Sequence, residues 1–140
     1  MGRIRLTNED IGFITIFEGI TGATVKDCIY DKEKEKITFI VSEGQAGIAI
    51  GRGGINIKKL EDKLKKKIEV LEFSKDPLKF LANIFRPVQI KNAYISEKSN
   101  GEKTLYASIS KDRLGMAKSK AKIAKELLKR YFDFQEVILQ

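Results

Sequence analysis

Residues 50–60, which read IGRGGINIKKL, are the most informative stretch of this chain for predicting its fold. Apolar residues at helical spacing lie on both sides of the glycines, so the stretch predicts a tight turn joining two helices. Gly51 and Gly54 have no Cβ atom, so a sugar-phosphate backbone can come close to the main chain. The amides and positive dipole end of the second helix would face that anion, and Arg52 would add positive charge. The neighbouring isoleucines are expected to anchor the two helices: Ile50, Ile55 and Ile57.

The spacing of these glycines excludes two nucleotide-binding motifs. A Walker A loop ends in Gly-Lys followed by Ser or Thr, and no glycine of this chain has that continuation. A dinucleotide fingerprint requires a third glycine where this chain has Asn56. A turn that binds no ligand would need the same glycines, so the motif by itself leaves that alternative open.

Six elements are expected in the first half of the chain. A capping pattern at residues 7–10 precedes apolar residues at helical spacing, and Gly22 supplies a stop. Alternation of Ile37, Phe39 and Val41 predicts a half-buried strand. The expected elements are a helix over 8–20, strands over 24–30 and 36–42, helices over 45–50 and 55–66, and a strand over 68–73.

The chain repeats itself at a distance of 68 residues. This shift, made without gaps, places Phe17 on Phe85 and retains the apolar skeleton although few residues are identical. The matched positions include Phe13 with Leu81, Ile16 with Ile84, Ile37 with Leu105, Val41 with Ile109, Ala49 with Ala117, and Leu60 with Leu128. The second half should therefore contain the same elements in the same order.

Local signals in the second half agree with the repeat. Asp76 and Pro77 are typical of a helix start, and Asn100-Gly101 is a strong hairpin signal. The expected elements are a helix from Asp76 to the Arg86-Pro87 pair, strands over 88–97 and 102–110, helices over 113–117 and 121–131, and a strand over 134–139. We therefore expect an α+β chain of two domains, residues 1–74 and 75–140, each α-β-β-α-α-β and packed as a rigid pair.

The second copy lacks the glycine turn. Gly51 to Gly54 are matched by Ser119-Lys120-Ala121-Lys122, whose Cβ atoms would block close approach of a phosphate backbone. Residues 75–140 nevertheless contain 14 basic and 7 acidic residues, a net charge of +7, against +1 for residues 1–74. The lysines in and around the segment that replaces the glycine turn either attract phosphates or only solvate a helix face. The charge excess favours the first, with contacts from Lys118, Lys120 and Lys122.

Composition narrows the class of protein. Hydrophobic residues make up 42% of the chain, enough for a core, and a net charge of +8 favours polyanionic partners, nucleic acid before an anionic membrane. The chain has no His and one Cys, Cys28, so it can build neither a disulfide nor a Cys/His metal cluster. We expect a monomeric, cytoplasmic protein that is not an enzyme, uses no cofactor or metal and does not span a membrane.

The turn and its surroundings resemble a known family. Ile-Gly-Arg-Gly-Gly-x-Asn-Ile between two helices is similar to the KH signature, and the element order resembles its prokaryotic, type II form. Two such copies filling 140 residues resemble the archaeal NusA-like transcription termination/antitermination factors. In KH domains this turn clamps the backbone of about four single-stranded nucleotides. The resemblance implies that Gly51, Arg52, Gly53 and Gly54 hold phosphates.

The resemblance implies a single-stranded RNA-binding protein that regulates transcription termination or antitermination, with RNA polymerase as a further partner. Lys58 and Lys59 join the predicted site because they lie in the first turns after the glycines. The predicted RNA-binding residues are Ile50, Gly51, Arg52, Gly53, Gly54, Ile55, Lys58, Lys59, Lys118, Lys120 and Lys122. The alternative is an adaptor that docks KH repeats on RNA polymerase or a ribosomal subunit with little RNA specificity. Single-stranded DNA would use the same groove, and the sequence does not separate it from RNA.

Overall fold

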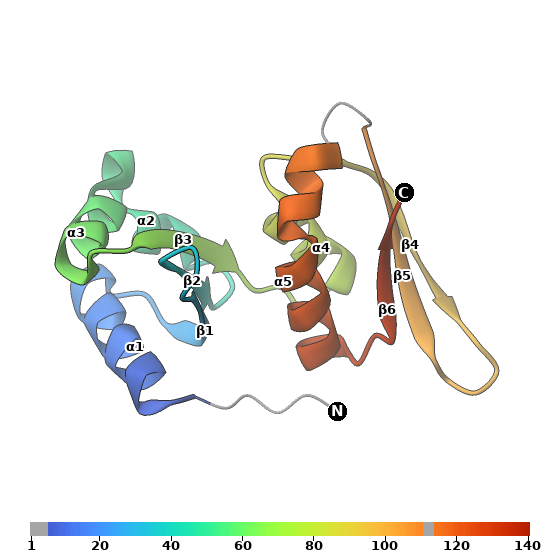
Figure 1. Ribbon diagram of the computed structural model, residues 1–140, viewed down its shortest axis with the longest axis horizontal. Helices are drawn as coiled ribbons and strands as arrows, with labels where there is room; N and C mark the ends of the chain where they lie inside the picture. The colour runs from blue at the N-terminus through green and yellow to red at the C-terminus, as the bar shows by residue number, and fades with distance from the viewer. Residues whose placement is uncertain (1–5, 111–113) are drawn as a thin grey trace. The chain divides into compact units, whose positions relative to one another are not determined.

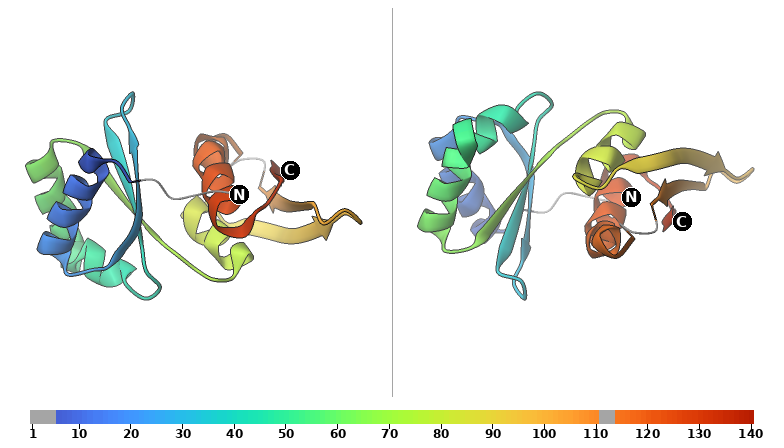
Figure 2. Two further views of the ribbon diagram at one scale, coloured as in Figure 1. Left: turned by 90° about the horizontal axis from the view of Figure 1, so that it is seen from below. Right: turned by 90° about the horizontal axis from the view of Figure 1, so that it is seen from above.

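A computed structural model describes residues 6–110 and 114–140, and the chain divides into two compact units (Figure 1). One unit ends at Ser74 and the other begins at Lys75. In each unit, helices cover one face of a three-stranded sheet (Figure 2). We call them the N-terminal unit and the C-terminal unit.

Helix α1 (Asn8–Thr21) begins and ends at the signals expected from the sequence. The Asp10 amide donates to the Thr7 hydroxyl at 3.0 Å, and the Thr7 amide donates to the Asp10 carboxylate at 3.1 Å. This capping box gives partners to two amides that would otherwise have none. Gly22 ends the helix at φ 74°, a backbone conformation that strains residues with a Cβ atom.

The N-terminal sheet has the strand order β1-β2-β3. Strands β1 (Val25–Asp31) and β2 (Lys36–Val41) pair antiparallel, and β3 (Lys67–Glu72) pairs parallel to β2. The connection back to β3 is made by α2 (Ala46–Ile50), the short 3₁₀ helix η1 (Arg52–Gly54) and α3 (Ile55–Leu64). The α-β-β-α-α-β order predicted for this unit is confirmed.

The core of the N-terminal unit lies between its helices and its sheet. Phe17 and Phe39 have no exposed surface, and their ring centroids lie 4.2 Å apart. The same buried cluster contains Ala23, Cys28, Ile37, Val41, Ala49 and Leu60. Burial raises the pKa of the Cys28 thiol to about 12, so this thiol stays protonated at neutral pH as part of the buried cluster.

The C-terminal unit repeats this plan. Its elements are α4 (Pro77–Phe85), β4 (Ile90–Glu97), β5 (Lys103–Ile109), α5 (Leu114–Phe132) and β6 (Glu136–Leu139). The strand order is β4-β5-β6, with β4 and β5 antiparallel and β5 and β6 parallel. The predicted start of the first helix is confirmed, because Pro77 is its first residue and the Asp76 carboxylate accepts a hydrogen bond from the Leu78 amide at 3.0 Å.

The 68-residue repeat reappears in the burial of matched side chains. Four matched pairs have no exposed surface at either member: Phe17 with Phe85, Ile37 with Leu105, Ala49 with Ala117, and Leu60 with Leu128. Equivalent positions therefore form equivalent cores, and the predicted α+β chain of two similar repeats is confirmed.

The prediction of two helices in the second copy, over 113–117 and 121–131, was wrong. Helix α5 runs without a break over Leu114–Phe132, the interval that the 68-residue shift gives for α2 through α3. A left-handed residue with a Cβ costs about 1–2 kcal/mol, so a segment without glycine favours continuation of the helix over a turn. Arg113, where the shorter helix was expected to begin, lies outside the described residues.

Candidate nucleic-acid interface

The turn between α2 and α3 is built from three glycines in conformations that other residues avoid. Gly51 has φ 78° and ψ 166°, Gly53 has φ 63°, and Gly54 has φ 77°. The Gly51 amide donates to the Gly47 carbonyl at 3.0 Å, and the Gly54 amide donates to the Gly51 carbonyl at 3.1 Å. The turn is therefore tight and ordered by its own backbone, because the glycines permit positive φ angles.

The side chain of Asn56 stabilises this turn through a hydrogen bond to α2. Its side-chain amide donates to the Ile48 carbonyl at 3.0 Å, which ties the first turn of α3 to α2. A Cβ atom placed on Gly51 would lie 2.9 Å from Asn56 Nδ2 and 3.0 Å from Ile55 Cγ2. Gly51 is therefore required by packing as well as by its backbone angles. The sequence identified Asn56 only as part of a motif, and its contact with α2 becomes visible in the structure.

Gly53 and Gly54 have open space where their Cβ atoms would be. Apart from the adjoining residues, no atom of the described chain lies within 4 Å of either Cβ position. Gly54 is also the residue before α3, and it supplies no side chain to cap the first turn of that helix. The main chain at this point is therefore accessible to a ligand, with the positive end of α3 behind it.

Three cations lie in the turn or shortly after it along the chain, Arg52 in η1 and two lysines in α3. Arg52, Lys58 and Lys59 are exposed, and none of them forms an ion pair within the described part of the chain. Their charges are therefore not neutralised by neighbouring carboxylates, and they can attract an anion to the accessible main chain.

The isoleucines around the turn are exposed. The sequence predicts that Ile50 and Ile55 anchor the two helices, but in the structure these residues are 39% and 49% exposed. Ile48, on the same short helix, is 51% exposed, whereas Ile57 is half-buried. The anchoring prediction is wrong for Ile50 and Ile55. Ile50 and Ile55 therefore expose aliphatic side chains directly beside the glycines, where they suit the faces of unpaired bases, whereas Ile48 lies two residues before Ile50 and so on another face of α2.

The structure separates the predicted lysines of the second copy. Lys118 and Lys122 are exposed on α5, whereas the Lys120 ammonium donates to the Ile84 and Arg86 carbonyls. Those carbonyls lie at the end of α4, where a helix leaves acceptors without partners. Lys120 therefore has a structural role that the sequence did not indicate, and we remove it from the candidate interface.

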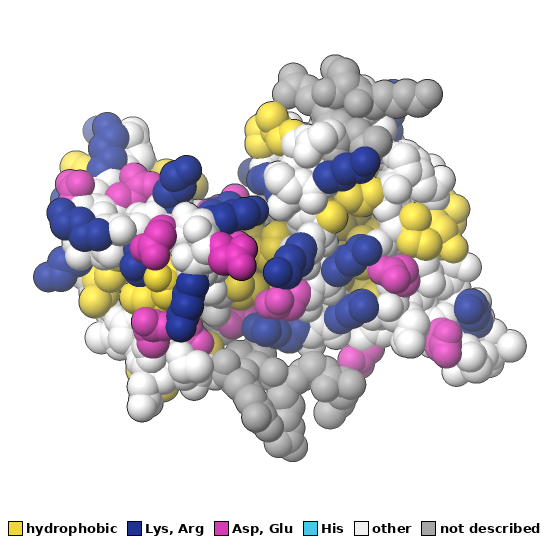
Figure 3. All heavy atoms as spheres, in the orientation of Figure 1, with side chains coloured by type: hydrophobic (Ala, Val, Ile, Leu, Met, Phe, Trp, Pro, Cys, Tyr) yellow, Lys and Arg dark blue, Asp and Glu magenta, His cyan; other side chains and the backbone are white. Residues whose placement is uncertain are grey.

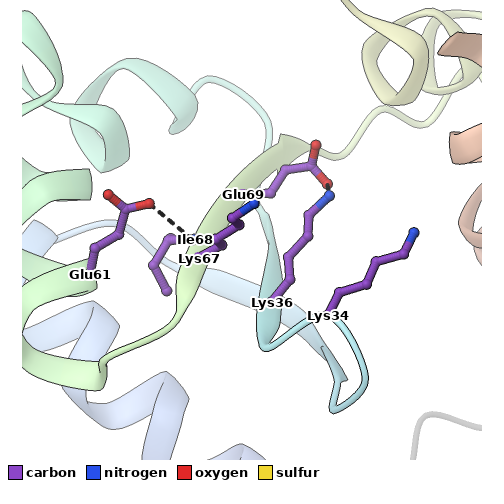
Figure 4. Close-up of a pocket in the computed structure, with 6 residues that line it drawn as sticks. All are labelled: Lys34, Lys36, Glu61, Lys67, Ile68 and Glu69. Carbon is purple, nitrogen blue, oxygen red and sulfur yellow. Dashed lines mark hydrogen bonds and ion pairs between the residues drawn. The ribbon is translucent and has the colours of Figure 1, made fainter.

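A separate hollow of about 630 Å³ lies at the opposite end of α3 (Figure 4). Its lining residues are Lys34, Lys36, Glu61, Lys67, Ile68 and Glu69. Within it, the Lys36 ammonium pairs with the Glu69 carboxylate at 3.2 Å, and the Ile68 amide donates to Glu61 at 3.4 Å. Since carboxylates offset its lysines, this hollow does not extend the interface at the turn.

Within residues 6–110 and 114–140, none of the helices is long and apolar enough to cross a membrane. No group of three or more His, Cys, Asp or Glu side chains among the same residues is placed to hold a metal ion.

Comparison with known proteins agrees with this geometry. The family model described as "KH domain" matches residues 14–99. The protein named probable transcription termination protein NusA of Methanococcus vannielii is 45% identical over 98 residues, which cover 70% of this chain and 56% of that protein. The protein of the same name from Methanocaldococcus jannaschii is 42% identical, with 51% of its length covered, so the match spans about half the length of these two relatives.

Other matches extend over nearly the whole chain. The Halobacterium salinarum protein, also named probable transcription termination protein NusA, is 32% identical, with 97% of this chain and 98% of that protein covered. The crystal structure of APE1850 superposes with a TM-score of 0.80 at 36% identity, covering 96% of this chain and all of that one. This chain belongs to the family of archaeal NusA-like transcription termination proteins, built on the KH domain.

Proposed function

We propose that this chain binds single-stranded RNA at the turn between α2 and α3 and acts in transcription termination. The observation that carries the proposal is the main chain at Gly53 and Gly54, which is exposed or half-exposed at the start of α3 and has, apart from the adjoining residues, no atom of the described chain within 4 Å of either Cβ position. Phosphates would lie against these glycines and the start of α3, near the Arg52 guanidinium.

Exposed aliphatic side chains beside the turn supply the second part of the proposed binding mode. Ile50 and Ile55 expose such side chains at the ends of the two helices that the glycines join. A single strand whose phosphates lie on the turn would place its bases over these side chains, while a duplex would keep its bases stacked and paired. The site therefore favours unpaired RNA.

The transcription role is supported by the names of the full-length relatives, which are called probable transcription termination proteins. We also propose that the protein contacts RNA polymerase and acts in termination or antitermination. We further propose that it is a cytoplasmic monomer without catalytic activity. The lack of histidine and the inert thiol of Cys28 support binding over catalysis.

One observation favours a second role for part of the chain. The C-terminal unit has a continuous helix where the N-terminal unit has its glycine turn, so it lacks the accessible main chain that a KH clamp uses. A unit of this kind could serve as the adaptor that docks on RNA polymerase or a ribosomal subunit while the N-terminal unit holds RNA.

The proposal is tested by Gly53→Asp/Gly54→Asp, measured by binding to single-stranded RNA, matched single-stranded DNA and duplex RNA across a salt series. Both new side chains point into open space, and Asp tolerates positive φ better than most residues, so the fold should persist. Like charges facing the phosphates should cost about 3 kcal/mol, or about a 100-fold loss of affinity for single-stranded RNA.

The matched control is Gly44→Asp/Gly101→Asp. Both glycines have positive φ, at 79° and 89°, and both have open Cβ positions, but neither lies in the turn. The control adds the same two charges and should retain most of the affinity. Equal losses in the two variants, or a folded turn variant that binds like wild type, would contradict the proposal.

A further inference from the structure

Helix α5 carries a row of lysines along one face. At 3.6 residues per turn, Lys118, Lys122, Lys125 and Lys129 fall within an arc of about 60°. Figure 3 shows Lys and Arg side chains following one another over α5. We call these four residues the α5 lysine row. They extend along about 16 Å of the helix, given a rise of 1.5 Å per residue.

The opposite face of α5 packs into the C-terminal unit. Ala117, Ala124, Leu127 and Leu128 on that face have no exposed surface. Lys120 also projects from that side and reaches the carbonyls at the end of α4. The lysine row is therefore set apart from the core by the helix itself, and its members face solvent.

Within the described part of the chain, the ion pairs of α5 lie in the C-terminal half of the helix. Lys125 pairs with Glu136 at 3.3 Å, and both side chains are less than half exposed. Glu126, the single acidic residue of α5, pairs with Arg130 at 3.4 Å. Lys118 and Lys122 are exposed and form no ion pair within the described part of the chain. The uncompensated charge is therefore concentrated in the first half of α5.

This charged half of α5 occupies the place of the glycine turn. The 68-residue shift carries Ile50 to Lys118 and Gly54 to Lys122. Where the N-terminal unit offers bare main chain and aliphatic side chains, the C-terminal unit offers two free ammonium groups on a continuous helix. Lysine acts as a point charge on a flexible stem, so it can meet a phosphate without a fixed backbone geometry.

We infer that the α5 lysine row binds the phosphates of single-stranded RNA independently of base sequence, chiefly through Lys118 and Lys122. The inference rests on the proposed function, because it assumes that the single-stranded RNA bound at the glycine turn also contacts a second surface of the chain. The row contains no apolar anchor, and protein interfaces are depleted of Lys and need a hydrophobic centre, so an acidic protein surface fits it less well.

The test is Lys118→Ala/Lys122→Ala, compared with wild type in a salt titration of binding to two single-stranded RNAs of unrelated sequence. Each lost phosphate contact should reduce the slope of log K against log salt by about 0.7, so the pair should reduce it by about 1.4. If wild type and variant converge at 1 M salt, this slope difference is about a 25-fold loss at 0.1 M. Alanine preserves the helix, which circular dichroism checks directly.

The matched control is Lys91→Ala/Lys98→Ala, which removes the same charge from exposed positions of the same unit outside α5. It should leave the slope close to that of wild type. An unchanged slope in the α5 variant overturns the inference, as does an equal decrease in the control. A decrease confined to one of the two RNA sequences would overturn the claim of sequence independence.

The Gly53→Asp/Gly54→Asp variant separates this inference from the proposed function. If that variant binds like wild type while the α5 variant loses slope, the turn proposal fails and the α5 lysine row stands. If the turn variant loses affinity while the α5 variant matches wild type, the turn stands and the row is only a solvated helix face.

Discussion

Replacing Gly51 by alanine should lower the free energy of unfolding of the N-terminal unit by about 1.5–3.5 kcal/mol. Gly51 has φ 78° and ψ 166°, a region open almost only to glycine, and entering it costs other residues about 1–3 kcal/mol. The new Cβ atom would lie 2.9 Å from Asn56 Nδ2. Asn56 would have to move and release the Ile48 carbonyl, a loss of about 1 kcal/mol.

Gly54→Ala is the matched comparison, since Gly54 also has a positive φ, 77°, but has no atom within 4 Å of its Cβ position. The left-handed conformation should cost alanine about 1–2 kcal/mol. Alanine also reduces the conformational entropy of the unfolded chain, which stabilises the folded state by about 0.5 kcal/mol. The net loss of stability should therefore be about 1 kcal/mol. The same entropy difference applies to Gly51→Ala, so the two variants should differ by about 1.5 kcal/mol.

Urea denaturation followed by circular dichroism measures the difference. Because the two units can unfold separately, hydrogen exchange of individual peptides should assign the loss to residues 6–74. Equal destabilisation by the two substitutions, or a loss for Gly51→Ala no larger than about 1 kcal/mol, would refute the argument that Asn56 and the backbone angles exclude a side chain at this position.

Three further predictions follow from single side chains. Lys120→Ala should lower stability by about 1–3 kcal/mol in thermal melts, because the carbonyls at the end of α4 lose the ammonium that donates to them. As the control, Lys118→Ala should lower stability by less than about 0.5 kcal/mol. Cys28 should not react with a thiol reagent at pH 8 unless denaturant is added, because burial raises its pKa to about 12, and rapid labelling of the native protein would contradict this. Since the folded state holds this proton more tightly, the stabilisation linked to Cys28 should be complete below the ordinary thiol pKa of 9.0 and should be lost as the pH rises toward 12. Ala121→Gly should lower stability by about 1 kcal/mol, as in any helix interior, and a smaller loss would indicate that α5 is already frayed there.

Local signals predicted most of the fold. The cap at Thr7, the Asp76-Pro77 helix start and the Asn100-Gly101 hairpin each depend on neighbours within about four residues, so the sequence contains what is needed to identify them. The break predicted inside α5 failed for a different reason. The repeat was extended to a segment, Ser119 to Lys122, whose own residues favour helix and provide no left-handed position.

The sequence by itself determined the element order, the repeat, the glycine turn and the excess of positive charge, because these follow from composition, period and local backbone preference. Only the tertiary structure decided which side chains are available to a ligand. Lys120 and Lys122 are two residues apart, yet one caps α4 and the other faces solvent, because positions two apart on a helix lie on different faces. Likewise Ile50 and Ile55 have the residue type of a core but remain exposed, since burial depends on which elements pack over a side chain and not on its hydrophobicity alone.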